Sequence, residues 1–584
     1  MFGKIVYISD NVAHVEIPAG TPVAENLMNM HVIFEDANKK ILGEIADISQ
    51  SLIKIGFLGE IVNGRFVGGV IRKPKLSSNI RIISREELAL IIGDNKPGTM
   101  LLGNSPLYDD CQIRVGINDL FSNHMAIFGN TGSGKSCGVA RLLQNVFYDP
   151  NFLPFRSNFL IFDAYGEYHN AFRDINKINP NLQFKYYTTN RAEEGAPKLQ
   201  IPLWLLNVED LALLLEASSH SQLTIIEKML KLVKIFSQSD DQSIRYRNHL
   251  IAKAIMNILY TNQTSPSKRN DIFTILATCS TPQFNLEAPV QGVGYVRKFR
   301  ECFVMNKDGQ FAESILVTEY ISSFIDQELE KYEPINDTYY TLEDMEKAMN
   351  FTLISEGLLK NEKMYDEAIM LRVRLHALVI GENSVYFKMD RYMTMDQYIS
   401  SLVACPDGKK AQIINFNLED VDDGFAKSIT KIYTRMLFEF TKRLKDRASI
   451  PFHIFLEEAH RYVQEDNDKF LLGYNIFERV AKEGRKYGLI FNLISQRPVE
   501  LSETVISQCS NFIIFKMTHP RDLEYIKKML PNISAEVVEK QKSLQPGTCV
   551  AFGKAFKIPM IVKMEMPNPE PYSSNCDVYE RWKA

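Results

Sequence analysis

A glycine-rich run in the first third of the chain constrains the fold more than any other feature of the sequence. The run follows a short apolar segment, Met125–Phe128, and precedes a segment with helical periodicity, Ser136–Phe147. A chance glycine-rich turn is the alternative, but it would not require the strand, the helix and the final Lys-Ser pair. The eight residues that match the phosphate-binding loop pattern are Gly129, Asn130, Thr131, Gly132, Ser133, Gly134, Lys135 and Ser136.

This loop predicts a nucleotide site because its residue types suit the chemistry of phosphate. The glycines allow successive backbone N–H groups to turn onto phosphate oxygens, and the helix N-terminus adds positive potential. Lys135 is expected to reach the β and γ phosphates, and the Ser136 hydroxyl is expected to bind Mg²⁺. ATP and Mg²⁺ are therefore the predicted ligands.

A second apolar run, Phe452–Leu456, leads directly into two carboxylates, Glu457 and Glu458. A nucleotide site needs an acidic partner at the end of another central strand, and this pair supplies it. We expect Glu457 to bind Mg²⁺ and Glu458 to orient and deprotonate the attacking water. The alternative is the start of a helix, where the helix dipole favours acidic residues.

Two further elements fit a hydrolysing enzyme better than a simple switch. The apolar run Leu489–Ile494 is followed by Gln496, which could sense the γ phosphate from the end of a strand; an ordinary polar turn is the alternative. Arg485 lies in a basic helical segment with Arg479 and Lys482, and it could act as an arginine finger on a neighbouring subunit. A solvated basic helix face is the alternative for any one of these residues.

A third apolar run, Phe159–Phe162, ends in an acidic turn that contains Asp163 and Glu167. This turn should lie at the nucleotide edge of the sheet, because the carboxyl ends of parallel strands meet there. Either carboxylate could contact water, Mg²⁺ or a neighbouring subunit, and the spacing does not decide between these partners.

The rest of the chain divides by its pattern of apolar residues. Short β-type runs with Gly and Asn turns predict a small barrel or sandwich at the N-terminus, and strands that alternate with helices predict an α/β core with a parallel sheet. Helical periodicity predicts an insertion in this core, with an irregular segment around Thr264–Asn270. The tail is expected to pack as an extended strap or to fray. The predicted parts are 1–95 (β domain), 96–202 (first part of the core), 203–405 (helical insertion), 406–567 (second part of the core) and 568–584 (tail).

Composition narrows the class of protein. The 584 residues are too many for one compact core. A formal net charge of -4 argues against a protein that coats DNA over its whole surface, although a local basic channel remains compatible with it. The eight cysteines show no metal-ligand spacing, and no apolar stretch approaches a membrane span. We expect free thiols, no membrane association and a soluble, cytoplasmic protein.

Taken together, these motifs resemble the HerA family of hexameric DNA-translocating ATPases, which is related to the FtsK motors. The order of the motifs is more specific than any one of them, and the resemblance covers nearly the whole chain. The segments that carry it are His124–Gly129, Asp163–Tyr168, Ile201–Trp204, Leu456–Arg461, Glu483–Gly488, Ser495–Pro498 and Ile506–Asn511.

The resemblance implies a RecA-like core, an N-terminal β-barrel and a homo-hexameric ring, with ATP between neighbouring subunits and double-stranded DNA in the centre. It assigns Glu458 as the catalytic carboxylate, Arg485 as the trans-acting finger and Gln496 as the sensor. One departure concerns Glu457, where family members often carry Asp. The longer side chain can still reach a metal through water, so activity is expected with an altered metal geometry.

The resemblance also implies a partner protein. HerA-like proteins work with NurA-type nucleases in DNA end processing or, in bacterial antiphage systems, with a sirtuin-like NADase or another nuclease effector. The N-terminal β domain is the expected docking surface. Two functions remain open: a translocase that moves along DNA, and a nucleotide-regulated hexameric scaffold that assembles an effector with little movement. A membrane-coupled secretion ATPase is disfavoured because no membrane span is present.

Overall fold

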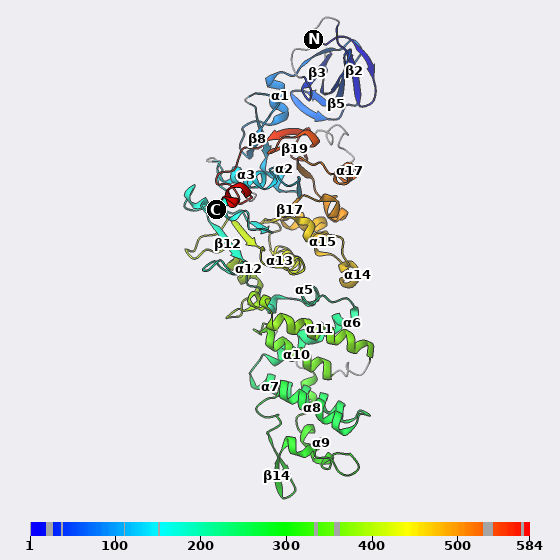
Figure 1. Ribbon diagram of the computed structural model, residues 1–584, viewed down its shortest axis with the longest axis vertical. Helices are drawn as coiled ribbons and strands as arrows, with labels where there is room; N and C mark the ends of the chain where they lie inside the picture. Colours follow the sequence, from blue (N-terminus) through cyan, green and yellow to red (C-terminus); the bar gives the residue numbers. More distant parts are fainter. Residues whose placement is uncertain are drawn as a thin grey trace. The chain divides into compact units, whose positions relative to one another are not determined.

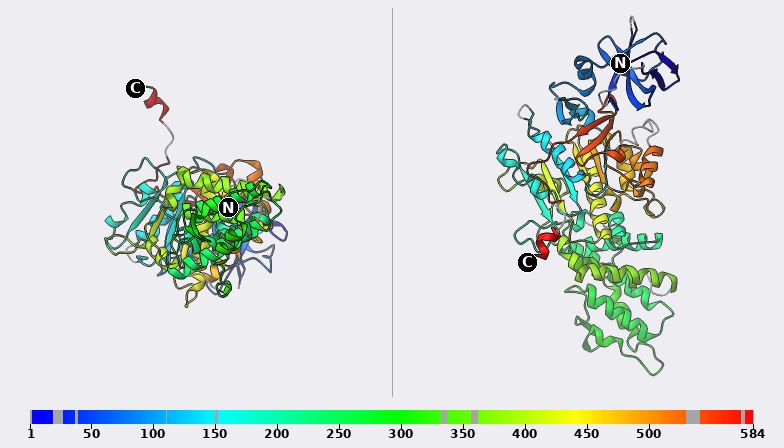
Figure 2. Two further views of the ribbon diagram at one scale, coloured as in Figure 1. Left: turned by 90° about the horizontal axis from the view of Figure 1, so that it is seen from below. Right: turned by 45° about the horizontal axis from the view of Figure 1, so that its top comes forward.

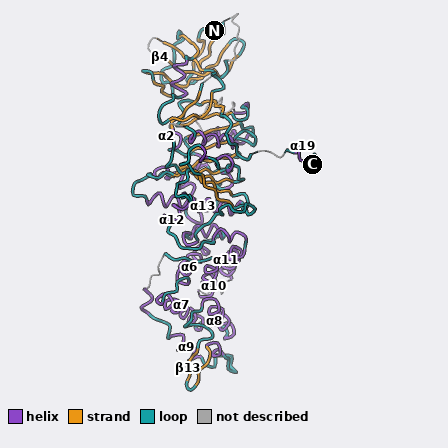
Figure 3. Tube along the Cα trace, turned by 90° about the vertical axis from the view of Figure 1, so that its left-hand side faces the viewer, coloured by secondary structure: helices purple, strands orange, loops and turns teal. Residues whose placement is uncertain are grey.

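The computed structural model describes residues 2–18, 27–36, 39–109, 111–149, 152–331, 337–355, 362–529, 541–573 and 577–583. The chain divides into two compact units. The first comprises residues 1–197, 400–466 and 475–584, and the second comprises residues 198–399 and 467–474. The first unit is rich in strands and the second is mainly helical, as the orange and purple segments of Figure 3 show.

A large mixed sheet forms the centre of the first unit (Figures 1 and 2). Its first seven strands are parallel, and the strand that precedes the glycine-rich loop, β10, lies between β17 and β18. The strands in their spatial order are β12 (Phe184–Thr188), β15 (Ile413–Asn417), β11 (Phe159–Asp163), β16 (Phe452–Leu456), β17 (Leu489–Ser495), β10 (Met125–Phe128), β18 (Asn511–Phe515), β19 (Thr548–Gly553), β20 (Met560–Lys563), β8 (Thr99–Asn104) and β9 (Gln112–Gly116). The predicted α/β class with a RecA-like core is confirmed.

Helices cover both faces of the parallel strands. In β11, Phe159 packs against Phe147 of helix α3 (Lys135–Phe147), whereas Phe162 packs against Tyr433 of helix α13 (Asp423–Arg443). Side chains alternate along a strand, so these two residues point to opposite faces of the sheet. All five residues of β11 are buried, as expected for a strand covered on both sides.

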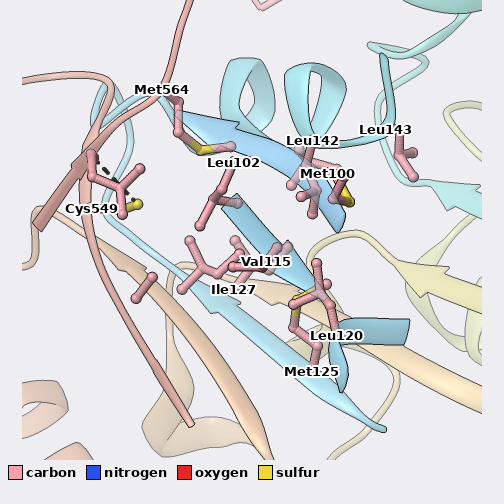
Figure 4. Close-up of a cluster of buried hydrophobic side chains, with 14 of the residues drawn as sticks. Met100, Leu102, Val115, Leu120, Met125, Ile127, Leu142, Leu143, Cys549 and Met564 are labelled. Atoms are coloured by element: carbon pink, nitrogen blue, oxygen red, sulfur yellow. Dashed lines mark hydrogen bonds between the residues drawn. The ribbon is translucent and has the colours of Figure 1, made fainter. Parts of the chain in front are cut away.

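The antiparallel strands β19, β20, β8 and β9 extend the sheet beyond β18, and the sequence pattern did not predict them. Their inner side chains join the core of the unit. Met100 and Leu102 of β8 lie beside Ile127 of β10 and Leu142 of α3, and Met564 follows β20 into the same cluster (Figure 4). This packing fixes the position of the strand and helix on either side of the glycine-rich loop.

The N-terminal part of the first unit contains the expected small β domain as a single antiparallel sheet. In its path β1, β2, β5, β4, β3 and β7 follow one another, and β6 pairs with β5. Asn63 and Gly64 have positive φ angles of 50° and 70°, which suit the tight hairpin turn between β5 and β6. The strands are β1 (Ile5–Ile8), β2 (Val12–Glu16), β3 (His31–Asp36), β4 (Lys39–Ile48), β5 (Leu52–Val62), β6 (Arg65–Gly68) and β7 (Asn79–Ile82).

The second unit is mainly helical, as the apolar periodicity predicted, and it also contains the short hairpin of β13 (Pro289–Gly292) and β14 (Tyr295–Lys298). Its main helices are α5 (Val208–Leu214), α6 (His220–Phe236), α7 (Asp241–Leu259), α8 (Ser265–Cys279), α9 (Ser314–Ser322), α10 (Leu342–Ser355) and α11 (Glu362–Ile380). The expectation of an irregular segment around Thr264–Asn270 was wrong, because α8 begins at Ser265. Pro266 sits in the first turn of this helix, where its missing N–H costs no hydrogen bond. Within the described residues, no helix is both long and apolar enough to cross a membrane.

Candidate nucleotide site

The glycine-rich loop lies at the carboxyl end of β10 and leads into α3. Gly134 has a φ angle of 90°, and a Cβ atom at this position would lie 2.7 Å from the backbone nitrogen of Gly547. A residue with a side chain would therefore have a strained backbone at position 134 and would also collide with the backbone of Gly547. The Gly547 N–H donates to the carbonyl of Ser133 at 3.0 Å, which holds the loop against the sheet.

The order of the strands brings the predicted chemical groups to one edge of the sheet. β17 pairs with β10 on one side and with β16 on the other, so the residues that follow these three parallel strands are neighbours. The hydroxyl of Thr131 in the loop donates to Gln496 Oε1 after β17 at 2.7 Å. Gln496 therefore contacts the glycine-rich loop directly, and its role as a sensor of the γ phosphate stays a prediction.

Lys135 and Glu458 form a buried ion pair at the centre of this edge. Lys135 Nζ lies 3.0 Å from Glu458 Oε1, and each side chain is only 7% exposed. On its other side, Glu458 Oε2 lies 3.2 Å from His460 Nδ1, which is 3.1 Å from the hydroxyl of Ser495. This chain of contacts fixes the carboxylate relative to both the loop and the end of β17.

The backbone of Glu458 adopts an unusual conformation. Its φ and ψ angles are 46° and 48°, in the left-handed region that non-glycine residues rarely occupy. Such residues cost about 1–3 kcal/mol and concentrate at active sites, where the surrounding structure holds them in place. The strand β16 thus ends in a sharp turn that points the carboxylate toward Lys135 instead of continuing into a regular helix.

Glu457 lies in a buried acidic group with Asp163 and Glu167. Burial raises the pKa of Glu457 well above its usual value, and the charges of Asp163 and Glu167 act in the same direction. Burial also raises the pKa of Glu167, whereas a hydrogen bond from Ser136 opposes this shift. Asp163 is held by N–H donors from Glu167 and Tyr168 at 3.0 and 2.9 Å, so it shapes the acidic turn.

These residues fit Mg²⁺ when a nucleotide contributes phosphate oxygens. Glu457 Oε2 and Glu167 Oε2 are buried oxygens without a hydrogen-bond partner, and Ser136 lies beside them. Mg²⁺ prefers such oxygen ligands and usually binds through one or two carboxylates together with substrate phosphates. In the described part of the chain, no group of three or more His, Cys, Asp or Glu residues could hold a metal ion by itself.

A pocket of about 440 Å³ opens between the loop and these carboxylates. This volume lies within the range of about 300–1,000 Å³ that is typical of small-molecule sites. The residues that line it are Asn130, Thr131, Gly132, Gly134, Lys135, Ser136, Cys137, Tyr165, Glu167, Glu458, Gln496 and Ser573. Gly129, Ser133 and Glu457 do not line the pocket.

Arg485 lies at the amino ends of the parallel strands, on the side of the sheet opposite to the pocket. Its Nη1 donates to Asn123 Oδ1 at 2.7 Å, and Asn123 precedes β10 while Arg485 precedes β17. Because these strands are parallel, both residues lie at their amino ends, away from the pocket at the carboxyl ends. Arg485 therefore does not reach the nucleotide site of its own subunit, and its role as a trans-acting finger stays a prediction.

The sequence pattern did not identify three residues that take part in the site. His460 contacts Glu458, although its position three residues beyond Glu457 gave no chemical signal. Cys137 and Ser573 line the pocket, but Ser573 comes from the C-terminal tail, whose composition suggested only an extended or frayed segment. Glu167 was expected in an acidic turn at the nucleotide edge of the sheet, but the spacing did not specify its contact with Ser136.

Comparison with known proteins identifies relatives along most of the chain. Residues 98–280 match the family model described as "Helicase HerA, central domain". A "DNA double-strand break repair helicase HerA" from Sulfurisphaera tokodaii is 24% identical over 519 residues, covering 87% of this chain and 77% of that relative. A "Probable helicase" from Methanocaldococcus jannaschii is 24% identical over 585 residues, covering 97% of this chain and 85% of that protein.

Proposed function

We propose that this chain, a P-loop ATPase with a HerA-type central domain, uses ATP hydrolysis to move along double-stranded DNA. The observation that carries the proposal is the convergence of Lys135, Glu458 and Gln496 on one pocket. The same chain is similar over most of its length to relatives named as DNA helicases, which supports DNA as the track.

The proposed hydrolysis uses the residues of the pocket in separate roles. Backbone N–H groups of the loop bind the β and γ phosphates, and Lys135 exchanges its contact with Glu458 for the phosphate oxygens. Glu458 then orients a water molecule for attack on the γ phosphorus and accepts its proton. Gln496 links the γ phosphate to β17 through its contact with Thr131.

Ser136, Glu457 and Glu167 are the residues that we propose to hold Mg²⁺ together with the nucleotide. Bound Mg²⁺ would neutralise charge on the β and γ phosphate oxygens. The side chain of Glu457 is buried and lies beside two other carboxylates, so a nearby cation would offset their mutual repulsion.

We propose that six copies form a ring in which Arg485 acts on the nucleotide of the neighbouring subunit. The side chain is exposed and lies far from its own pocket, as a trans-acting group must. Arg485→Ala is expected to lower turnover about 10- to 100-fold, because a charge-assisted hydrogen bond contributes about 1.5–3 kcal/mol. ATP binding and the size of the assembly should not change; steady-state hydrolysis and size-exclusion chromatography with light scattering measure these properties.

Arg479→Ala is the matched control for this variant, because Arg479 lies on helix α15 (Ile476–Glu483) and packs over Phe438 of the same chain. Unchanged turnover in Arg485→Ala together with a large loss of turnover in Arg479→Ala would assign the arginine finger to Arg479 instead. Equal and small effects of both substitutions on turnover would show that neither Arg479 nor Arg485 is the arginine finger.

The N-terminal β domain is the proposed docking surface for a nuclease or NADase effector. Its strands and loops expose apolar side chains that contribute nothing to its core, among them Val6, Tyr7, Val67 and Ile71, with Ile71 94% exposed. Exposed apolar residues of this kind are typical of protein interfaces. An effector in antiphage defence or DNA end processing would bind here, and the motor would bring it to DNA.

DNA-dependent hydrolysis tests the proposed function. Addition of linear double-stranded DNA should increase ATP turnover several-fold at low salt, and the increase should diminish as salt rises, because binding to phosphates releases counterions. The assay is run with and without a candidate effector. Hydrolysis that is indifferent to DNA in both cases, while the effector still binds, would instead favour the nucleotide-regulated scaffold.

A further inference from the structure

The nucleotide pocket has a wall that neither the glycine-rich loop nor the acidic strand ends supply. This wall consists of Cys137, in the first turn of α3, and Ser573, near the C-terminus. The Cys137 Sγ and Ser573 Oγ atoms are 3.9 Å apart. We refer to residues 565–573, which lead to this position, as the C-terminal strap.

The C-terminal strap is attached to the core at successive backbone positions. It follows helix α3 and then the short helix α4 (His169–Phe172) before it reaches the pocket. Its anchors are Tyr148 Oη to the Asn568 carbonyl (2.9 Å), Gln144 Nε2 to the Pro569 carbonyl (2.9 Å), Asn170 Nδ2 to the Glu570 carbonyl (2.8 Å) and the Tyr572 N–H to the Glu167 carbonyl (2.8 Å). The position of Ser573 is therefore set by the fold of the nucleotide site itself.

The direction of a bound triphosphate follows from the groups that bind its terminal phosphate. Lys135 is expected to reach the β and γ phosphates, and it lies 3.0 Å from Glu458. Glu458 and Gln496 therefore mark the γ-phosphate end of the pocket. The N–H groups at the start of α3 bind the preceding phosphates. The nucleoside must then extend past the first turn of the helix, toward the wall formed by Cys137 and Ser573.

We propose that Cys137 and Ser573 form the nucleoside-binding wall of the ATP pocket, so that the C-terminal strap is part of the nucleotide site. The proposal rests on the ATP site described above and does not depend on movement along DNA. A thiol and a hydroxyl are small, so the wall leaves space for a nucleoside. The strap also hydrogen-bonds to the backbone of Glu167, and the Glu167 side chain contacts Ser136. These contacts connect the proposed nucleoside wall to the proposed Mg²⁺ site.

Alkylation of the full-length protein tests which part of the nucleotide lies beside Cys137. Modification of each cysteine by a maleimide is followed by mass spectrometry in the presence of ATP, ADP or inorganic tripolyphosphate. ATP and ADP should slow the modification of Cys137 at least fivefold, whereas saturating tripolyphosphate should slow it less than twofold. Cys111, which is partly buried and lies outside the pocket, is the internal control and should react equally in all samples.

A second measurement uses Ser573→Trp, which fills the proposed nucleoside space. The KM for ATP should rise about tenfold with kcat changed less than twofold, and the affinity for tripolyphosphate should stay the same. Tyr572→Trp is the matched control, because Tyr572 is 65% exposed and does not line the pocket. This control should leave KM within twofold of the parent protein.

Two results would overturn the proposal: equal protection of Cys137 by tripolyphosphate and ATP, or an unchanged KM in Ser573→Trp. Either result would leave the DNA-dependence of hydrolysis untouched. Conversely, hydrolysis without DNA stimulation would contradict the proposed motor, while protection of Cys137 by ATP and ADP would still support the nucleoside wall.

Discussion

Replacement of Glu458 by Gln is expected to lower ATP turnover by about 10²–10⁴-fold, which is the usual contribution of a general base. The amide has nearly the same shape as the carboxylate, but it cannot accept the proton of the attacking water. Its oxygen can still accept a hydrogen bond from Lys135, which lies 3.0 Å from the carboxylate. The local structure should therefore persist while the chemical step fails.

Binding of ATP to Glu458→Gln should be as tight as in the parent protein or tighter. The carboxylate is paired with Lys135, so the phosphates must compete with it for this cation. Removing the negative charge weakens the competitor and its repulsion of the γ phosphate. Isothermal titration calorimetry measures binding, and single-turnover hydrolysis measures chemistry.

Glu500→Gln is the matched control. Glu500 lies near the same edge of the sheet and pairs with Arg497 at 3.0 Å, but it does not line the nucleotide pocket. This substitution should leave binding and turnover close to the values of the parent protein. If Glu458→Gln loses binding and turnover in equal measure, Glu458 serves to bind the nucleotide and another group must accept the proton.

The residues that the sequence predicted best are those whose chemistry depends on short spacing. The loop from Gly129 to Ser136 must bind phosphate through consecutive N–H groups, so its pattern lies within a short stretch of sequence and can be recognised there. Glu457 and Glu458 could be found because a strand with four apolar residues out of five precedes them. The parallel sheet that brings these two elements together followed from the alternation of strands and helices.

Elements that depend on distant contacts were not predictable in the same way. The strands β8, β9, β19 and β20 are short and antiparallel, and the pair β8–β9 joins the sheet through the pairing of β8 with β20, which lies far along the chain. Ser573 reaches Cys137 across 436 residues of sequence, so no local pattern could place it in the pocket. The start of α8 was also missed, although proline, here Pro266, is favoured in a first helical turn.

Lys135→Ala is expected to lower kcat/KM for ATP by about 10³–10⁵-fold. Loss of a charge-assisted hydrogen bond weakens ground-state binding about 10- to 100-fold, and loss of a preorganised donor at the reacting group costs a further factor of about 10²–10³ in kcat. The effect on binding should be measured directly with ATP, because it distinguishes this variant from Glu458→Gln, which retains the nucleotide.

The substitution also tests the order of events that the buried pair implies. The side chains of Lys135 and Glu458 are each 7% exposed and contact each other, so alanine at position 135 leaves the carboxylate without its closest cation. A double variant, Lys135→Ala with Glu458→Gln, should recover part of any lost stability but none of the lost turnover, because the pair stabilises the fold while each residue acts separately in hydrolysis. Lys482→Ala, on the exposed face of α15, is the control and should change neither property. Turnover restored in the double variant would contradict separate roles for the two residues and would leave the ion pair as a purely structural element.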